Sequence, residues 1–371
     1  MDSARLLDSF CDLVRIESPS RHEAAMATRC ADELRDMGFS VRFDNTAAQT
    51  GSDTGNLIAY LPGTATGHIV LSAHMDTVEP CAGVEPVVAD GVVRSAGDTI
   101  LGADDKAGVA AIFEGVRSAV EEGWARPDIT VLLTTCEELH LLGSSALGSD
   151  ALPQGAPCYV FDADGAPGTV ITGAPCHYAL KAVFHGRASH AGVVPEAGIS
   201  AICMAASAIE AMPLGRLDEA TTANIGVIEG GRETNVVPDT CLVAGECRSL
   251  YRSRVDAQRD AMTTALENAA ARFGGSVDIE WEKSYDAVLY DEDDPLVQAI
   301  VRAVEATGLT PRFHHSGGGA DANVLAACGV RPVTLSVGMA NFHSLGEYIS
   351  VADLEDSARL VEALVAEGVR A

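Results

Sequence analysis

The sequence places histidine and carboxylate side chains at the ends of several short apolar runs. These side chains are His74, Asp76, Glu137, Glu138, Asp162 and His343, and a further pair, Asp104 and Asp105, follows Gly102. Imidazole and carboxylate groups are ligands that suit Zn²⁺, Mn²⁺ and Co²⁺ in proteins. One carboxylate can also bridge two such ions about 3.5–4 Å apart. Together the residues indicate a site for divalent transition metals, far more specifically than any one of them does.

Two adjacent carboxylates, Glu137 and Glu138, stand in TTCEELH after the apolar run 129–133. Like charges side by side repel, and a carboxylate at the end of a buried strand is costly unless something positive meets it. A pair of dications would meet both glutamates. Neighbouring side chains at a strand end point different ways, so the two can serve different roles.

Several of these residues have an alternative interpretation. His74 and Asp76 are two apart and share a face of an extended segment, so Asp76 could orient the imidazole rather than bind metal. Asp104 and Asp105 open a helical segment, where aspartates commonly cap the helix. Asp164 is the alternative to Asp162 in FDADG.

The apolar runs predict strands of a largely parallel α/β sheet. The runs cover 68–72, 129–134, 158–161 and 332–337, and helical segments are expected at 2–15, 22–37 and 105–120. Strands this short and continuously apolar are typical of a sheet covered on both faces. In open α/β sheets the ligand site lies beyond the carboxyl ends of the strands. Four segments distant in sequence therefore direct their polar side chains to one place.

The middle of the chain has another pattern of elements. Strands are expected at 178–186, 222–229, 240–249 and 276–285, with helices at 198–212 and 253–272. This βαββαβ order predicts a ferredoxin-like domain inserted into the α/β domain. We therefore expect a discontinuous catalytic domain, 1–175 and 288–371, and an inserted lid or dimerisation domain, 176–287. The acidic run DEDD at 291–294 is interpreted as the crossing between them.

Composition limits the classes of partner and compartment. The formal net charge of −28 argues against nucleic acid and anionic membranes as partners. No apolar stretch reaches about 18 residues, and the acidic start lacks a secretory pattern. The ten cysteines form no CxxC pair, and those in apolar segments, such as Cys30, Cys136, Cys203 and Cys241, are expected to be buried reduced thiols. A cytoplasmic location is therefore expected.

The motifs resemble those of one enzyme family. They are AHMDTV, LGADDKAG, TTCEELHLLGS, FDADG, GRASHAG, GGRETNVVPD, GECRS and NFHSLGEY, in that order between residues 73 and 348. The sequence is similar to the dinuclear zinc metallopeptidases that include peptidase T, carboxypeptidase G, acetylornithine deacetylase and succinyl-diaminopimelate desuccinylase. LGADDKAG and FDADGAPG resemble the peptidase-T-like branch of tripeptide aminopeptidases.

The resemblance implies a role for each motif residue of the α/β domain. His74 and Asp162 would bind one metal ion, Glu138 and His343 the other, and Asp104 would bridge both. Asp104 is preferred to Asp105 because it matches the first aspartate of the family motif. Asp76 would orient His74, and Glu137 would be the general base acting on a metal-bridging water.

The resemblance extends to the inserted domain. His190 would reach the active site of a neighbouring subunit and stabilise the oxyanion, which implies a homodimer formed through this domain. Asn235 and Arg248 would bind the substrate carboxylate. His140 and Cys136 are interpreted as packing or exposed residues, whereas substrate contact stays open for His177, His314 and His315.

The expected function is a cytoplasmic aminopeptidase that uses two divalent metal ions, expected to be Zn, with Co or Mn as alternatives. Its expected substrates are tripeptides or similar short peptides. An N-acyl or N-carbamoyl amino acid amidohydrolase, or a dipeptidase, would use the same site. A non-enzymatic binding protein on the same fold is the remaining alternative, and the presence of Glu137 argues against it.

Overall fold

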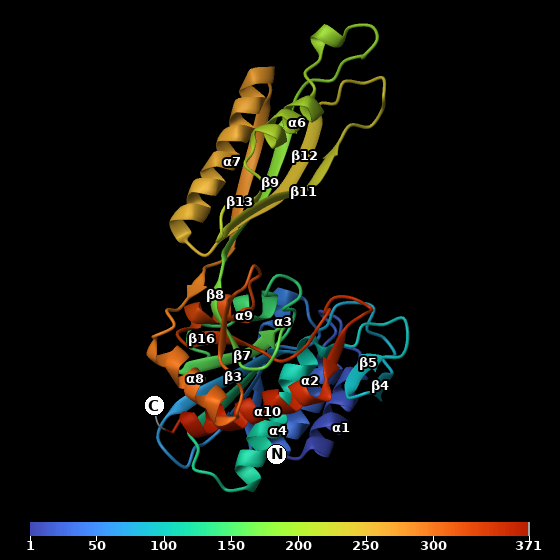
Figure 1. The fold of residues 1–371 in the computed structure, drawn as a ribbon. Coiled ribbons are helices and arrows are strands. Elements are labelled where there is room, and N and C mark those ends of the chain that lie inside the picture. The colour runs from blue at the N-terminus through green and yellow to red at the C-terminus, as the bar shows by residue number, and fades with distance from the viewer. Residues whose placement is uncertain (370–371) are drawn as a thin grey trace. The chain divides into compact units, whose positions relative to one another are not determined.

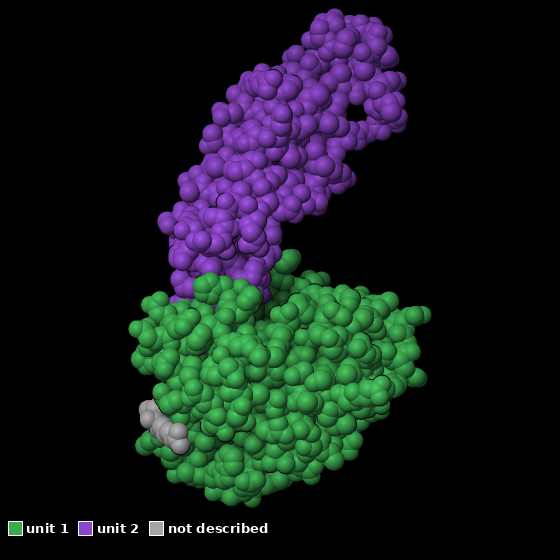
Figure 2. All heavy atoms as spheres, in the orientation of Figure 1, with its two compact units in different colours: residues 1–172, 290–315, 320–371 green, residues 173–289, 316–319 purple. Residues whose placement is uncertain are grey.

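The computed structural model describes residues 1–369, which form two compact units (Figures 1 and 2). Unit 1 comprises Met1–Thr172, Tyr290–His315 and Ala320–Ala371, of which the last two residues are not described. Unit 2 comprises Gly173–Leu289 and Ser316–Gly319. Among the described residues no helix has the length and apolar character needed to cross a bilayer.

The central sheet has the strand order β1-β2-β6-β3-β7-β16-β8-β14, and β15 pairs with β8. The strands are β1 (Ser40–Phe43), β2 (Leu57–Leu61), β6 (Asp128–Thr134), β3 (His68–His74), β7 (Pro157–Ala163), β16 (Arg331–Ser336), β8 (Thr169–Ala174), β14 (Val288–Leu289) and β15 (Arg312–His315). Its middle strands β6, β3, β7 and β16 are parallel, whereas β1, β2, β8 and β14 pair antiparallel. The α/β class with a mostly parallel sheet is therefore confirmed.

Helices cover both faces of this sheet, which explains why its strands are continuously apolar. The helices of unit 1 are α1 (Ser3–Val14), α2 (Ala24–Asp36), α3 (Ala47–Thr50), α4 (Ala103–Glu121), α5 (Leu142–Ser145), α8 (Pro295–Ala306), α9 (Asp321–Leu325) and α10 (Val351–Glu367). In β3, Ile69 and Leu71 pack in the large core with α1, α2, α4, α8 and α10. Val70, between them, packs in a second core that includes Ala322 and Leu325 of α9.

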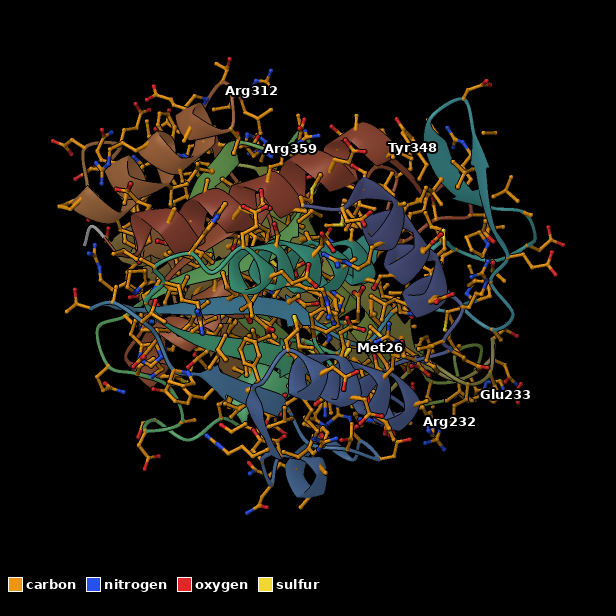
Figure 3. The ribbon with its side chains drawn as sticks, turned by 90° about the horizontal axis from the view of Figure 1, so that it is seen from below. Met26, Arg232, Glu233, Arg312, Tyr348 and Arg359 are labelled. Atoms are coloured by element: carbon orange, nitrogen blue, oxygen red, sulfur yellow. The ribbon has the colours of Figure 1, made fainter. Side chains whose placement is uncertain are left out.

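A buried helix and a small sheet complete unit 1. Sixteen residues of α4 are buried, and its N-terminal end carries Asp104 and Asp105. Figure 3 shows the side chains around this core, among them Met26, which is fully buried on α2. The small sheet has the order β17-β5-β4, with β17 (Tyr348–Ser350), β5 (Val92–Ser95) and β4 (Pro86–Ala89). Strand β17 follows the loop that carries His343.

Unit 2 is an antiparallel sheet with two helices. Its strand order is β10-β11-β12-β9-β13. The elements are β9 (Cys176–His185), α6 (Ala201–Ala211), β10 (Gly215–Arg216), β11 (Thr221–Gly230), β12 (Thr240–Ser249), α7 (Arg252–Phe273) and β13 (Ser276–Tyr285). Alternate residues of β9, such as Leu180, Ala182 and Phe184, pack against α6 and α7. The ferredoxin-like order of the inserted module is confirmed.

Two details differ from the expectations. The segment Ser316–Gly319 groups with unit 2, because Ser316 donates its N–H to the carbonyl oxygen of Gly173 and Gly317 accepts from Arg248. Cys203 is exposed rather than buried, so the expectation for this cysteine was wrong. The buried side of α6 presents Ala201, Met204, Ala205 and Ala208, and Cys203 lies off that stripe.

Candidate metal centre

Five segments of unit 1 bring their polar side chains to one place. His74 is the last residue of β3, Asp162 lies near the end of β7, and Glu138 follows β6. Asp104 stands at the start of α4, and His343 follows β16. The strands β3, β6, β7 and β16 are parallel, so they end at the same edge of the sheet. The polar residues that follow these strands therefore meet at that edge.

Asp104 lies between the two histidines. Its Oδ1 is 3.0 Å from Nε2 of His74, and its Oδ2 is 3.2 Å from Nε2 of His343. His343 Nε2 also lies 2.8 Å from Oε1 of Glu138, and His74 Nε2 lies 3.7 Å from Oδ1 of Asp162. Each histidine thus faces one oxygen of Asp104 and one further carboxylate. This is the arrangement expected when one carboxylate bridges two metal ions.

Two three-residue groups have ligand atoms close enough to hold an ion. One is His74, Asp104 and Glu138, and the other is His74, Asp105 and Asp162. Asp105 is already engaged, because its two oxygens accept the N–H groups of His74 and Gly108. Asp164 is exposed and belongs to neither group. His343 is also outside both groups, and its contacts with Asp104 and Glu138 place it at the site.

The charge of this cluster also fits divalent cations. Burial raises the pKa of Glu137 and of Asp162 well above the usual value, and the neighbouring carboxylates add to the shift. Burial opposes ionisation of Asp104 too, but hydrogen bonds from His343 and His74 outweigh it and lower its pKa. Hydrogen bonds to Asp104 and Glu138 raise the pKa of His343 to about 10. Within residues 1–369 no lysine or arginine forms an ion pair with the carboxylates of this cluster, so their only close cationic partners are the histidines.

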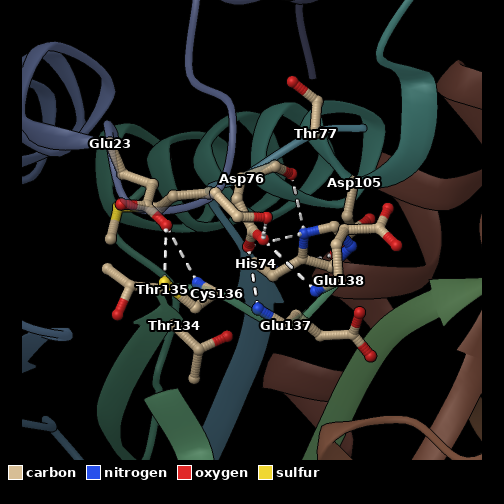
Figure 4. Close-up of polar contacts among 12 residues, drawn as sticks. Glu23, His74, Asp76, Thr77, Asp105, Thr134, Thr135, Cys136, Glu137 and Glu138 are labelled. Carbon is tan, nitrogen blue, oxygen red and sulfur yellow. Dashed lines mark hydrogen bonds and ion pairs between the residues drawn. The ribbon is translucent and has the colours of Figure 1, made fainter. Parts of the chain in front are cut away.

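Asp76 connects His74 to the loop of the two glutamates (Figure 4). Nδ1 of His74 lies 2.9 Å from the backbone oxygen of Asp76 and 3.4 Å from its carboxylate. Because Nδ1 donates to this backbone oxygen, Nε2, which faces Asp104, can carry the lone pair that binds a metal ion. The Asp76 carboxylate accepts the N–H groups of Glu137 and Glu138, at 3.0 and 3.2 Å, and the hydroxyl of Ser20. Asp76 therefore contacts the glutamate loop as well as the imidazole.

Two buried carboxylates near the site were missed by the sequence reasoning. Glu347 accepts the N–H groups of Leu101, Gly102 and Asp104, and so holds the backbone that carries the central carboxylate. Its signal was an acid four residues after His343 in NFHSLGEY. Asp321 is almost fully buried and accepts the Thr134 hydroxyl. Its signal was a lone acid in the small-residue stretch SGGGADAN.

The cysteine beside the glutamates is a buried thiol. Burial and the nearby Glu23 carboxylate raise the pKa of Cys136 to about 12. A thiol with this pKa stays protonated at neutral pH, so it is not an activated nucleophile. His140, on the other side of the glutamates, is exposed and lies outside both ligand groups.

In unit 2, Arg248 belongs to a polar network at one end of the sheet. Its Nε and Nη2 donate to the carboxylate of Glu246 at 3.0 and 2.8 Å, and its Nη1 donates to Gly317 O at 3.3 Å. His177 lies 2.9 Å from the same carboxylate and stacks on Tyr285. The bond to His177 and those to Arg248 outweigh burial and lower the pKa of Glu246 to about 2. The partners of Arg248 were not anticipated from sequence.

His190 and Asn235 lie at the opposite end of unit 2. The N–H of Ala191 bonds to Asn235 O, and His190 forms a bridge with Val236, so the two loops are side by side. Both His190 and Asn235 are exposed. From Thr240 to Arg248 the extended strand β12 spans roughly 26 Å at about 3.3 Å per residue. Within one chain, unit 2 therefore does not bring Asn235 or His190 to Arg248.

The chain is similar in sequence and structure to known proteins. Residues 70–367 match the sequence model of Peptidase family M20/M25/M40. The protein YqjE of Bacillus subtilis is 41% identical over the full length of both chains. The crystal structure of aminopeptidase PepT from Bacillus cereus is 40% identical, with a TM-score of 0.94 and complete coverage of both chains. A tripeptidase structure from Staphylococcus aureus is 33% identical, with a TM-score of 0.96 and the same coverage.

Proposed function

The chain belongs to Peptidase family M20/M25/M40, and from this membership and its site we propose that it is a two-metal aminopeptidase acting on tripeptides and similar short peptides. One observation carries the proposal: the two oxygens of Asp104 face the Nε2 atoms of His74 and His343 at 3.0 and 3.2 Å. The 40% identical aminopeptidase and the 33% identical tripeptidase support the class of substrate.

In this proposal Asp104 would bridge two ions. His74 and Asp162 would hold one ion, and His343 and Glu138 the other, with the distances between these pairs as support. When bound, the ions would lower the pKa of the attacking water and polarise the peptide carbonyl. The mixed nitrogen and oxygen donors favour Zn, with Co or Mn as alternatives.

Glu137 is proposed as the general base. Glu138, rather than Glu137, lies 2.8 Å from Nε2 of His343, and burial, together with the neighbouring carboxylates, raises the pKa of Glu137. A carboxylate with a raised pKa can take the proton of the attacking water and later give it to the leaving amine. The hydrogen bonds of Asp76 to the backbone of Glu137 and Glu138 would keep the base and the ligand in their separate positions.

Arg248 is proposed to bind the C-terminal carboxylate of the peptide. Glu246 accepts from Nε and Nη2 of the guanidinium, whereas Nη1 donates to the carbonyl of Gly317. Nη1 is therefore the group that would turn to the carboxylate of the substrate. A planar guanidinium held in this way is suited to carboxylate recognition. The cytoplasm is proposed as the location, since the ten cysteines are free thiols.

A substrate panel tests the proposed function. Purified protein loaded with Zn or Mn should release the N-terminal residue from free tripeptides with the highest kcat/KM of the panel. A tripeptide with a C-terminal amide should lose about 10–100-fold in kcat/KM, because it lacks charge-assisted bonds to Arg248. Amino acid release is measured by chromatography, with the metal content determined on the same preparation.

The same panel contains the outcomes against the proposal. Faster hydrolysis of N-acetyl or N-carbamoyl amino acids would make the protein an amidohydrolase, and faster hydrolysis of dipeptides a dipeptidase. Arg248→Ala is the control for the amide substrate, because this variant should have the same kcat/KM for the free tripeptide and for its amide. If Arg248→Ala still has a higher kcat/KM for the free tripeptide than for its amide, Arg248 is not the residue that binds the carboxylate.

We also propose a homodimer formed through unit 2. Strand β11 pairs with β10 only at Thr222 and Ala223, and its remaining outer edge carries the exposed side chains of Val227 and Ile228. An open apolar edge of this kind favours pairing with another chain. The separation of His190 and Asn235 from Arg248 within one chain supports a role for both at the site of a second copy.

Light scattering should give twice the 38.5 kDa mass of one chain. Because His190 would act on the neighbouring site, His190→Ala and Glu137→Ala should each be nearly inactive, while a mixture of the two exchanged into heterodimers should regain partial activity. The regained activity comes from the one site that has both Glu137 and His190. A fully active monomer, or a mixture without recovery, would contradict the proposal.

A further inference from the structure

The residue before the two glutamates has an unusual backbone conformation. Cys136 has φ = 53°, in the left-handed region that residues other than glycine, asparagine and aspartate seldom adopt. This conformation turns the chain between the end of β6 and Glu137. Side chains at neighbouring positions then face different groups: Glu138 contacts His343, whereas Glu137 lies among Asp162, Asp321 and His74. Whatever stabilises Cys136 in this conformation therefore also sets the directions of Glu137 and Glu138.

Cys136 is held by a carboxylate from the N-terminal part of the chain. Oε1 of Glu23 accepts both the N–H of Cys136, at 2.9 Å, and its thiol, at 3.3 Å (Figure 4). The same oxygen accepts the N–H of Arg21 at 3.0 Å, and Oε2 accepts the hydroxyl of Ser52 at 2.5 Å. Glu23 is fully buried. Four donors from three segments thus satisfy one carboxylate that has no access to water.

A simpler role in the fold does not account for this placement. Glu23 is the N-cap residue of α2, where its side chain would usually bond to the first turn, but it makes no such bond. Asp53 accepts the N–H of Ala24 in its place. Within residues 1–369, Glu23 also forms no ion pair with a lysine, arginine or histidine. A buried carboxylate without an ion-pair partner is costly unless it is hydrogen-bonded, and two of the four bonds that Glu23 accepts come from Cys136.

The neighbouring residues join the same segment to the other side of the site. The hydroxyl of Ser20 donates to Asp76 at 2.6 Å, and the hydroxyl of Ser18 donates to the carbonyl of Met75 at 2.9 Å. Residues 18–23, which we call the N-terminal clamp, therefore contact the His74 strand end and the glutamate loop. Asp76 holds the N–H groups after Cys136, and Glu23 holds the N–H of Cys136 itself.

We propose that Glu23 is a positioning residue for Glu137 and Glu138, acting through the backbone and thiol of Cys136. It does not touch the ligand groups, so its effect would come from orientation alone. The role in turnover rests on the proposed function, because it requires Glu137 to be the base. The role in orienting Glu138 concerns metal binding and can be measured without a substrate.

Glu23→Ala should lower kcat by about 100-fold, since a small displacement of a catalytic group is costly, with KM changed less than about threefold. The visible absorption of the Co²⁺-loaded variant should also differ from that of the wild type, because Glu138 is reoriented. Glu23→Gln should recover most of kcat, because its amide oxygen can still accept from Cys136 while its NH₂ meets Ser52. Glu23→Asp, which keeps the charge but is one methylene too short, should behave like Glu23→Ala and replaces it if that variant fails to fold.

The matched control is Glu114→Ala, which removes another buried carboxylate of unit 1, one bonded to Arg5 and to the N–H of Asp2. This variant should lower the Tm and leave kcat and the Co²⁺ spectrum unchanged. If Glu23→Ala and Glu23→Asp keep kcat within about threefold of the wild type and show its Co²⁺ spectrum, the positioning role is refuted. If the wild type hydrolyses no peptide, the proposed function fails, and the Co²⁺ spectra still decide the role of Glu23.

Discussion

Glu137→Ala should abolish peptide hydrolysis while the protein keeps both metal ions. Loss of a general base costs about 10²–10⁴-fold in kcat, so we expect a loss at the upper end of this range. The metal content should persist because the five proposed ligands all stay in place: His74, Asp104, Glu138, Asp162 and His343. Stopped assays on tripeptides measure kcat, and elemental analysis after dialysis measures the metal content.

The backbone N–H of Glu137, rather than its side chain, is bonded to Asp76, so Glu137→Ala should leave the loop conformation unchanged. Glu137→Gln serves as the matched variant, since it has the same shape and cannot accept a proton in the same way. It should be as inactive as alanine. A variant that keeps more than about a tenth of the wild-type kcat would exclude Glu137 as the base.

Glu138→Ala should instead remove one metal ion. Glu138 lies 2.8 Å from His343 Nε2, and its side chain is largely buried, so it would supply the second carboxylate on that side of Asp104. Its loss would leave His343 and one oxygen of Asp104 for this ion. We expect the metal content to fall from two ions to one per chain after dialysis. Because the bridging arrangement is then incomplete, kcat should fall by at least about 10³-fold.

The two glutamate variants are controls for each other. Prepared and dialysed together, Glu137→Ala should hold two ions and Glu138→Ala one, although both are inactive. His343→Ala should match Glu138→Ala, because both would remove ligands of the same ion. Two tightly bound ions in Glu138→Ala would show that this residue is not a ligand. Excess Zn²⁺ added back should restore part of the activity of Glu138→Ala and none of Glu137→Ala.

The strands and the class of the site follow from local features of the sequence. A strand covered on both faces must be apolar along its length, so runs such as Ile129–Leu133 predict the buried sheet. The residues that end these runs lie at one edge because parallel strands share their direction. The motifs with His74, Glu138 and Asp162 then suffice to recognise the peptidase family. The ferredoxin-like domain was predictable from the βαββαβ order of the elements in the middle of the chain.

The supports of the site were decided only by the tertiary structure. Glu23, Glu347 and Asp76 act mainly by accepting backbone N–H groups of distant loops, at Cys136, at Leu101–Asp104 and at Glu137–Glu138. Every residue except proline has such an N–H, so the sequence carries no sign of which one a carboxylate will meet. The loop conformation selects the partner, as the positive φ of Cys136 illustrates. The sequence by itself thus determined the class of the site, because that depends on the chemical type of the side chains that end the strands. The folded chain decided what holds them in place, because that depends on geometry between segments far apart in sequence.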